Sequence, residues 1–188
     1  MYKAVFIDRD GTVNEEMGYI NHPDRLKIFP EALEAIKILN QLEYKAILVS
    51  NQAGLARGYF NEQVLFETHM KMKTAFSDQG AFFDLTIYCP FLPGAAVKKY
   101  DMDHPCRKPQ TGMIDTAAKI FDLDLDNSYI IGDRHKDMDF GRRAGLTPLL
   151  VRTGYGKGEE LMGGFPEASS PHMTFDNILE AVLWIKGL

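Results

Sequence analysis

Short apolar runs alternate with amphipathic stretches along the chain, and this alternation restricts the fold more than any other feature. Apolar runs of strand length lie at residues 3–8, 45–50, 84–89, 128–133 and 147–153. Stretches with apolar residues at helical spacing lie at residues 30–42, 61–80, 112–123, 138–145 and 176–188. This order is typical of a parallel sheet with right-handed crossovers and helices on both faces. We therefore predict an α/β fold with a doubly wound parallel sheet.

The segments between these elements are expected to be irregular where Gly and Pro gather. Such segments lie at residues 11–29, 51–58, 90–111 and 154–171. Asn61 and Asp176 are the expected N-caps of the helices that follow them. The insertions between the predicted elements are short, so we expect no large cap domain above the sheet.

The length and composition limit the setting in which the chain works. With 188 residues, it is expected to form a single domain over residues 1–188. A net charge of −5 disfavours nucleic acid as a partner. Neither a membrane-spanning run nor a signal peptide is evident, and two cysteines make no disulfide framework. We expect a cytoplasmic protein without a membrane partner, and a monomer because no heptad or apolar stripe stands out.

Polar residues follow the predicted strands at the edge where parallel sheets bind ligands. They include four acids, two bases, a hydroxyl and two amides: Asp8, Asp10, Ser50, Asn51, Gln52, Arg107, Lys108, Asp133 and Asp137. An isolated pair such as Asp8 and Asp10 is often a turn acid beside a solvated acid, and Asp133 alone can be a helix N-cap. Several carboxylates in one crevice, however, repel one another unless a hard cation such as Mg²⁺ lies among them.

This set of residues suits phosphoryl transfer. One carboxylate can attack phosphorus and form an aspartyl-phosphate, while Lys108 and the metal offset charge on the phosphoryl oxygens. A second carboxylate can protonate the leaving oxygen and later deprotonate water. Ser50 and the main-chain N–H of Asn51 can hold a phosphoryl oxygen.

Four motifs in this order resemble those of the haloacid dehalogenase superfamily of phosphatases: "DRDGT", "ILVSNQ", "CRKP" and "GDRHKD". The likeness extends from residue 4 to about residue 153. It implies a nucleophile, Asp8, and a general acid and base, Asp10. It implies catalytic roles for Ser50 and Lys108, and a supporting acid at Asp137. The implied Mg²⁺ ligands are Asp8, Asp10 and Asp133.

A narrower likeness is carried by "DRDGTVN", "GYI", "SNQAGLARGYF", "CRKPQTGM" and "LVRTG". These segments are similar to D-glycero-D-manno-heptose 1,7-bisphosphate phosphatases, which remove the 7-phosphate in lipopolysaccharide or S-layer precursor synthesis. The substrate-binding residues that this resemblance implies are Glu16, Met17, Gly18, Tyr19, Ser50, Asn51, Gln52, Ala53, Arg107, Lys108 and Arg134. The chain has Ser50 where the family has Thr, and Arg134 where it commonly has Lys. Both changes keep the hydroxyl or the charge.

The family also carries a structural zinc, and here its loop is altered. Cys89 and Cys106 match two ligands, and His104 takes the place of a third. Phe91 stands where the family has a ligating His, so three ligands remain where a structural zinc site has four. A degenerate zinc site and a metal-free loop packed by Phe91 are the alternatives, and we favour the metal-free loop.

Other functions remain open at this stage. Histidinol-phosphate phosphatases share the "RKP" motif and the cysteine loop, and another small phosphate monoester is a further substrate class. A phosphate-binding module without catalysis is the alternative outside enzymes, but the complete set of residues argues against it. Arg107 suits a second anionic group on the substrate, with an ordinary surface ion pair as the alternative. His69 is expected to be a packing residue, and neither His22 nor His135 is expected to be catalytic.

Overall fold

A computed structural model of the chain describes residues 1–162 and 170–188 and contains one parallel sheet. The strands are β1 (Ala4–Ile7), β2 (Lys45–Asn51), β3 (Leu85–Cys89), β4 (Tyr129–Gly132), β5 (Thr147–Val151) and β6 (Met173–Phe175). Their order across the sheet is β3-β2-β1-β4-β5-β6, and every neighbouring pair is parallel. The first five strands confirm the predicted ones, and β6 extends the sheet by one strand.

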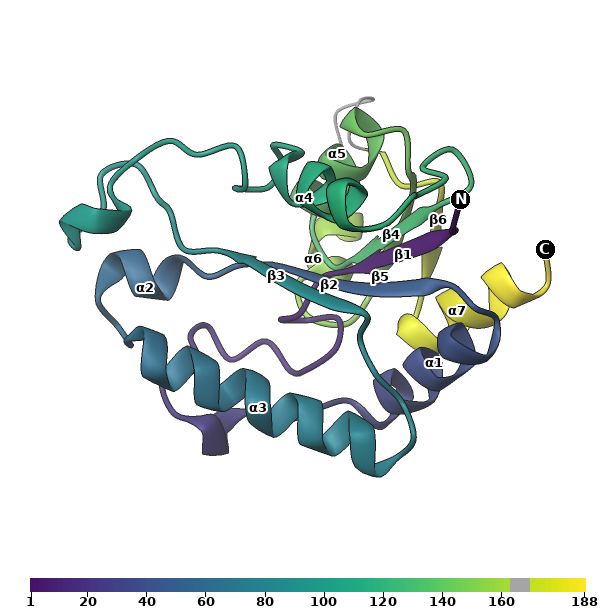
Figure 1. The fold of residues 1–188 in the computed structure, drawn as a ribbon, viewed down its shortest axis with the longest axis horizontal. Coiled ribbons are helices and arrows are strands. Elements are labelled where there is room, and N and C mark those ends of the chain that lie inside the picture. Colours follow the sequence, from purple (N-terminus) through teal and green to yellow (C-terminus); the bar gives the residue numbers. More distant parts are fainter. Residues whose placement is uncertain (163–169) are drawn as a thin grey trace.

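Helices cover both faces of this sheet. They are α1 (Pro30–Gln41), α2 (Ala53–Arg57), α3 (Glu62–Asp78), α4 (Gly112–Ile120), α5 (His135–Arg143), α6 (Gly156–Leu161) and α7 (Ile178–Lys186). Helices α4 and α5 lie on one face, while α1, α3 and α7 lie on the other (Figure 1). The doubly wound architecture is thus confirmed, and no large cap domain stands over the sheet in the described part of the chain.

Strand β1 lies in the middle of the sheet, and both of its faces are buried. Val5 and Ile7 pack against the layer that holds α1 and α7, while Ala4 and Phe6 pack against the layer of α4 and α5. The chain runs from β1 to β2 and β3 in one direction across the sheet, and from β4 to β5 and β6 in the other. Residues that follow β1 therefore lie where the winding reverses, which is where ligands bind in such folds.

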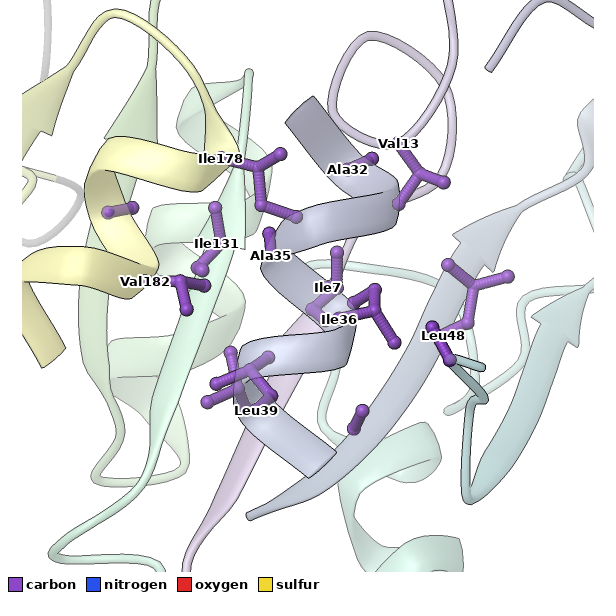
Figure 2. Close-up of a cluster of buried hydrophobic side chains, with 14 of the residues drawn as sticks. Ile7, Val13, Ala32, Ala35, Ile36, Leu39, Leu48, Ile131, Ile178 and Val182 are labelled. Atoms are coloured by element: carbon purple, nitrogen blue, oxygen red, sulfur yellow. The ribbon is translucent and has the colours of Figure 1, made fainter. Parts of the chain in front are cut away.

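The larger core cluster shows why α1 forms where the sequence predicts it. Its apolar residues recur at helical spacing and form one buried stripe: Ala32, Ala35, Ile36 and Leu39. This stripe packs on the sheet beside Ile7 and Ile131, and beside Ile178 and Val182 of α7 (Figure 2). Pro30 at the first position starts the helix, since its fixed φ suits that site.

Short elements are where the sequence-based expectations were wrong. Helix α2 forms in a stretch expected to be a turn, and α6 forms inside residues 154–171, which were expected to be irregular. Residues 163–169 of that stretch lie outside the described residues. These elements are too short for a visible period, and tertiary contacts stabilise them; Leu55 and Ala56 of α2, for instance, are buried beside Phe60.

The N-cap of α7 also differs from the expectation. Asn177 is the cap, because its side-chain oxygen accepts a hydrogen bond from the Glu180 N–H at 3.1 Å. The carboxylate of Asp176 instead pairs with Arg152 at 2.7 Å. Asn61 is confirmed as the cap of α3, with its side chain accepting from the Val64 N–H at 3.0 Å. Among the described helices, none has the length and apolar character needed to cross a membrane.

Replacing Asn177 by Ala tests the corrected cap. We expect Asn177→Ala to lower the free energy of unfolding by about 1 kcal/mol, because the N–H groups at the start of α7 lose their acceptor. The matched control Asp176→Ala removes only an exposed ion pair and should cost less than about 0.5 kcal/mol. Urea unfolding at neutral pH measures both variants. A larger loss for Asp176→Ala would restore the original assignment.

Candidate active site

A buried lysine joins the ends of the central strands. The Nζ atom of Lys108 lies 2.6 Å from Asp8 Oδ1 and 2.6 Å from Asp137 Oδ1, and it donates to the Val49 carbonyl at 3.2 Å. Asp8 follows β1 and Asp137 lies in the first turn of α5. Lys108 is only 4% exposed, so its charge is balanced almost entirely by these two carboxylates. The structure thus brings predicted site residues from distant segments into direct contact.

Asn51 places this lysine. Its Oδ1 accepts from the Lys108 N–H at 3.0 Å, and its Nδ2 donates to the Lys108 carbonyl at 3.1 Å. Since Asn51 ends β2, this pair of hydrogen bonds ties the loop to the sheet immediately beside the site. The side chain of Asn51 therefore holds the loop.

Asp133 completes the acidic cluster after β4. It is fully buried; its Oδ2 accepts from the Tyr155 N–H at 2.8 Å, while its Oδ1 has no hydrogen-bond partner among the described residues. Carboxylate oxygens of Asp8, Asp133 and Asp137 all lie within 4.8 Å of one another. A buried carboxylate oxygen left without a donor is costly, and a cation relieves that cost.

Burial and mutual repulsion shift the pKa values of this cluster. Burial, followed by the neighbouring charges of Asp8 and Asp137, raises the pKa of Asp133 to about 9. Burial also raises the pKa of Asp8 to about 7, even though Lys108 opposes the shift. The pKa of Lys108 is raised as well, because its two carboxylate partners outweigh the effect of burial. An oxygen-only set of ligands with excess negative charge fits Mg²⁺.

Asp10 lies in a different environment, although it is two residues from Asp8. Its Oδ2 accepts from Arg9 Nη2 at 2.8 Å and from Gln52 Nε2 at 3.0 Å, and its Oδ1 accepts from Asn14 at 3.0 Å. Burial would raise the pKa of Asp10, but the Arg9 charge and these hydrogen bonds hold it below its usual value. The carboxylate is thus occupied on both oxygens and lies outside the acidic cluster. The Mg²⁺ contact expected of Asp10 stays a prediction.

A pocket of about 250 Å³ opens beside this cluster and gathers most of the predicted substrate-binding residues. Of the predicted residues, those that line it are Glu16, Gly18, Tyr19, Ser50, Asn51, Gln52, Ala53, Arg107, Lys108 and Arg134, with Asp8 and Asp10. Met17 is not part of the lining and packs against the apolar core instead. Ser50 lies beside Gln52, whose Nε2 donates to Ser50 Oγ at 2.6 Å.

Sequence reasoning missed Arg9, Lys136 and Tyr155, which also line the pocket. The basic residue between the two motif aspartates was a usable signal for Arg9. The Tyr155 ring packs under the Arg134 guanidinium, 4.2 Å from its Cζ. His22 and His135 are absent from the lining; His135 Nδ1 contacts Glu159 at 3.0 Å.

The loop before Lys108 packs through aromatic rings. The Phe91 ring stacks on His104 with centroids 4.3 Å apart and meets the Tyr100 ring edge-on at 6.2 Å. His104 Nδ1 accepts from the Cys106 N–H at 3.1 Å. Among the described residues, the ligand atoms of Cys89, His104 and Cys106 do not form a group within 4.8 Å. The metal-free state of this loop remains a prediction.

Comparisons with known proteins identify relatives of the chain. Residues 105–181 match a family model described as HAD-hydrolase-like. The D-glycero-D-manno-heptose-1,7-bisphosphate 7-phosphatase of Thermosynechococcus vestitus is 37% identical over 97% of this chain and 94% of its own. The D-glycero-beta-D-manno-heptose-1,7-bisphosphate 7-phosphatase of Photorhabdus laumondii is 38% identical over 80% of this chain and 81% of its own length. The crystal structure of D,D-heptose 1,7-bisphosphate phosphatase from B. bronchiseptica, complexed with magnesium and phosphate, has a TM-score of 0.87, 32% identity and 98% coverage of both chains.

Two glycines that follow β5 give a first test of the metal site. A Cβ on Gly154, whose φ is +57°, would lie 2.1 Å from Asp133 Oδ2, whereas a Cβ on Gly158 meets nothing within 4 Å. We expect Gly154→Ala to displace the Asp133 carboxylate and weaken Mg²⁺ binding about tenfold or more. Gly158→Ala, in α6, should bind Mg²⁺ normally. Isothermal titration with magnesium chloride compares the Mg²⁺ affinities of the two variants. Equal affinities would show that Asp133 does not hold the metal.

The raised pKa values give a second test. Without metal, the protonated forms of Asp8 and Asp133 favour the folded state, so their contribution to stability falls as pH rises through about 7 and about 9. Deprotonation also frees the ligands, so millimolar Mg²⁺ should raise Tm more at about pH 8 than at about pH 6. Asp133→Asn should shrink the Mg²⁺ effect at both values. A shift in Tm that is independent of pH would contradict this assignment.

Proposed function

The chain belongs to the D-glycero-D-manno-heptose-1,7-bisphosphate 7-phosphatase family of HAD-like hydrolases, and we propose that it removes the 7-phosphate of this sugar bisphosphate. The observation that carries the proposal is the placement of Asp8 and Lys108, in contact at 2.6 Å, on the wall of a pocket. The same pocket is lined by Arg107 and Lys136, for which no ion pair is found among the described residues.

We propose Asp8 as the nucleophile. Its Oδ1 is held by Lys108, which leaves the second oxygen for attack on the phosphorus of the 7-phosphate. As the P–O bond to the sugar breaks, Asp10 passes a proton to the departing oxygen, and an aspartyl-phosphate remains on Asp8. Asp10 then takes a proton from water, which attacks the phosphorus and releases inorganic phosphate. The free Asp8 carboxylate returns for the next turnover.

Charge on the phosphoryl oxygens must be offset during both steps. Lys108, the hydroxyl of Ser50 and the main-chain N–H of Asn51 are the groups that we assign to this task. Asp8, Asp10 and Asp133 would hold Mg²⁺, with Asp137 in support, and the ion would neutralise part of the phosphoryl charge. A phosphate dianion beside Asp10 also raises the proton affinity of that carboxylate, so a proton enters with the substrate.

Three basic residues of the pocket lining support a bisphosphate. They are Arg107, Arg134 and Lys136. Among the described residues, Arg107 makes no ion pair; its Nη1 donates to the Phe91 carbonyl at 3.1 Å, so its charge is available to a ligand. This favours a second anionic group on the substrate over the alternative of a surface ion pair. Histidinol phosphate carries a cationic amine instead of a second phosphate, and three basic side chains disfavour it.

Further parts of the proposal follow from the family resemblance. The product would enter heptose nucleotide synthesis for lipopolysaccharide or S-layer glycans in the cytoplasm. We also propose that residues 1–188 act as one domain and as a monomer. A non-catalytic phosphate-binding role is disfavoured, because the nucleophile and its lysine are in contact.

Phosphate release tests the proposal directly. With Mg²⁺, we expect selective turnover of D-glycero-D-manno-heptose 1,7-bisphosphate over histidinol phosphate and fructose 1,6-bisphosphate. Asp8→Asn should lower kcat by about 10⁴-fold or more, because the amide cannot form the covalent intermediate. Equal, feeble turnover of all three substrates would leave a phosphatase of another substrate class. If Asp8→Asn keeps its turnover, the assignment of Asp8 as the nucleophile is wrong.

A further inference from the structure

The arginine between the two motif aspartates has no role in the mechanism above, yet it is almost completely buried. The side chain of Arg9 is 2% exposed. Its Nε and Nη2 donate to Asp10 Oδ1 at 3.1 and 3.0 Å, and Nη2 also lies 2.8 Å from Asp10 Oδ2. A guanidinium cannot lose its charge in a protein, so burial of Arg9 needs acceptors close to its N–H groups. The carboxyl oxygens of Asp10 supply them.

A histidine from another layer contacts the opposite side of this guanidinium. Arg9 Nη1 lies 3.3 Å from His69 Nε2, and His69 belongs to α3. An arginine has donors only, so His69 Nε2 must be the acceptor, and the ring is neutral with its proton on Nδ1. Burial, followed by the Arg9 charge, lowers the pKa of His69 to about 4, in agreement with a neutral ring. His69 does not line the active-site pocket.

We propose that Arg9 is the positioning residue of Asp10, and that His69 fixes Arg9 from the α3 side. The inference rests on the proposed function, in which Asp10 moves the protons. A carboxylate on a short side chain can turn about its χ angles, and a planar guanidinium that contacts both oxygens restricts that rotation. Gln52 reinforces the arrangement, because its Oε1 accepts from Arg9 Nη2 at 3.0 Å while its Nε2 donates to Asp10.

The identity of the leaving group separates this role from general structural support. A sugar alkoxide needs the proton of Asp10 as the P–O bond breaks, whereas p-nitrophenolate leaves as a stable anion without one. A displaced Asp10 should therefore slow hydrolysis of the sugar bisphosphate far more than hydrolysis of p-nitrophenyl phosphate. Damage to the metal site, to Asp8 or to the fold would slow both substrates together.

Two substitutions at His69 make a matched pair. His69→Phe keeps a ring for the contact with Tyr88, whose centroid lies 5.8 Å away, but it removes the acceptor. His69→Gln loses the ring and keeps an acceptor. We expect His69→Phe to lower kcat on the heptose bisphosphate about tenfold or more, with KM unchanged and less than about a twofold change on p-nitrophenyl phosphate. His69→Gln should remain within about threefold of the parent on both substrates.

Asp10→Asn, assayed with the same two substrates, provides the reference for lost acid catalysis. If His69→Phe behaves like the parent while Asp10→Asn shows the leaving-group selectivity, the positioning role is overturned and the proposed function stands. If Asp10→Asn shows no such selectivity, the proton-transfer role of Asp10 fails, and the inference fails with it. If His69→Gln is impaired and His69→Phe is not, the ring acts through packing and the proposal is overturned.

A measurement on the unmodified protein keeps the proposal testable even if His69→Phe does not fold. Two-bond ¹H–¹⁵N correlation spectra report the protonation of each imidazole nitrogen. We expect Nε2 of His69 to remain unprotonated between about pH 6 and about pH 8, because Arg9 occupies it as a donor. A protonated Nε2, or a ring that titrates near its ordinary pKa, would show that the contact with Arg9 is not made.

Discussion

The contact of Lys108 with Asp8 and Asp137 is the interaction on which the rest of the site depends. Each carboxylate lies 2.6 Å from the ammonium, and the three groups come from the β1 end, the loop after β3 and α5. Removing one member of such a buried set leaves an uncompensated charge, at a cost of about 3 to 5 kcal/mol. The sheet order makes the set attainable, since β1 lies between β2 and β4. One ammonium cannot balance the charge of three carboxylates when Asp133 is ionised as well. A divalent cation would compensate the remaining negative charge.

The two aspartates of the first motif lie in different surroundings, which suits the different roles that we propose for them. Asp8 faces other carboxylates, and its pKa is raised to about 7; Asp10 faces Arg9, and its pKa is lowered. Environments that make the pKa values of two neighbouring carboxyl groups differ in this way are typical of sites in which one group is the nucleophile and the other the general acid and base. Arg9 contacts the Asp10 carboxylate, which lies outside the acidic cluster.

The sequence predicted the features that depend on periodicity and on chain order. Long apolar repeats such as that of α1 specify a helix, and parallel strands bring their carboxyl ends to one edge, so Asp8, Lys108 and Asp133 could be grouped in advance. The sequence did not predict the direction of side chains within a turn. Spacing alone did not indicate that the carboxylate of Asp137, rather than that of Asp10, lies beside Asp8 and Asp133. Contacts between layers, such as that of His69 with Arg9, were equally out of reach, because no local pattern encodes them.

The loop after β3 connects this chemistry to packing far from the sheet. Phe91 lies between His104 and Tyr100, and its carbonyl accepts from Arg107. Tyr100 in turn donates to Glu62 at the start of α3. The aromatic stack therefore sets the path of the chain that delivers Lys108, and the Asn51 hydrogen bonds fix its last step. Since α3 also carries His69, one helix supports the lysine through this loop and Asp10 through Arg9, so both carboxylates of the first motif depend on how α3 is seated.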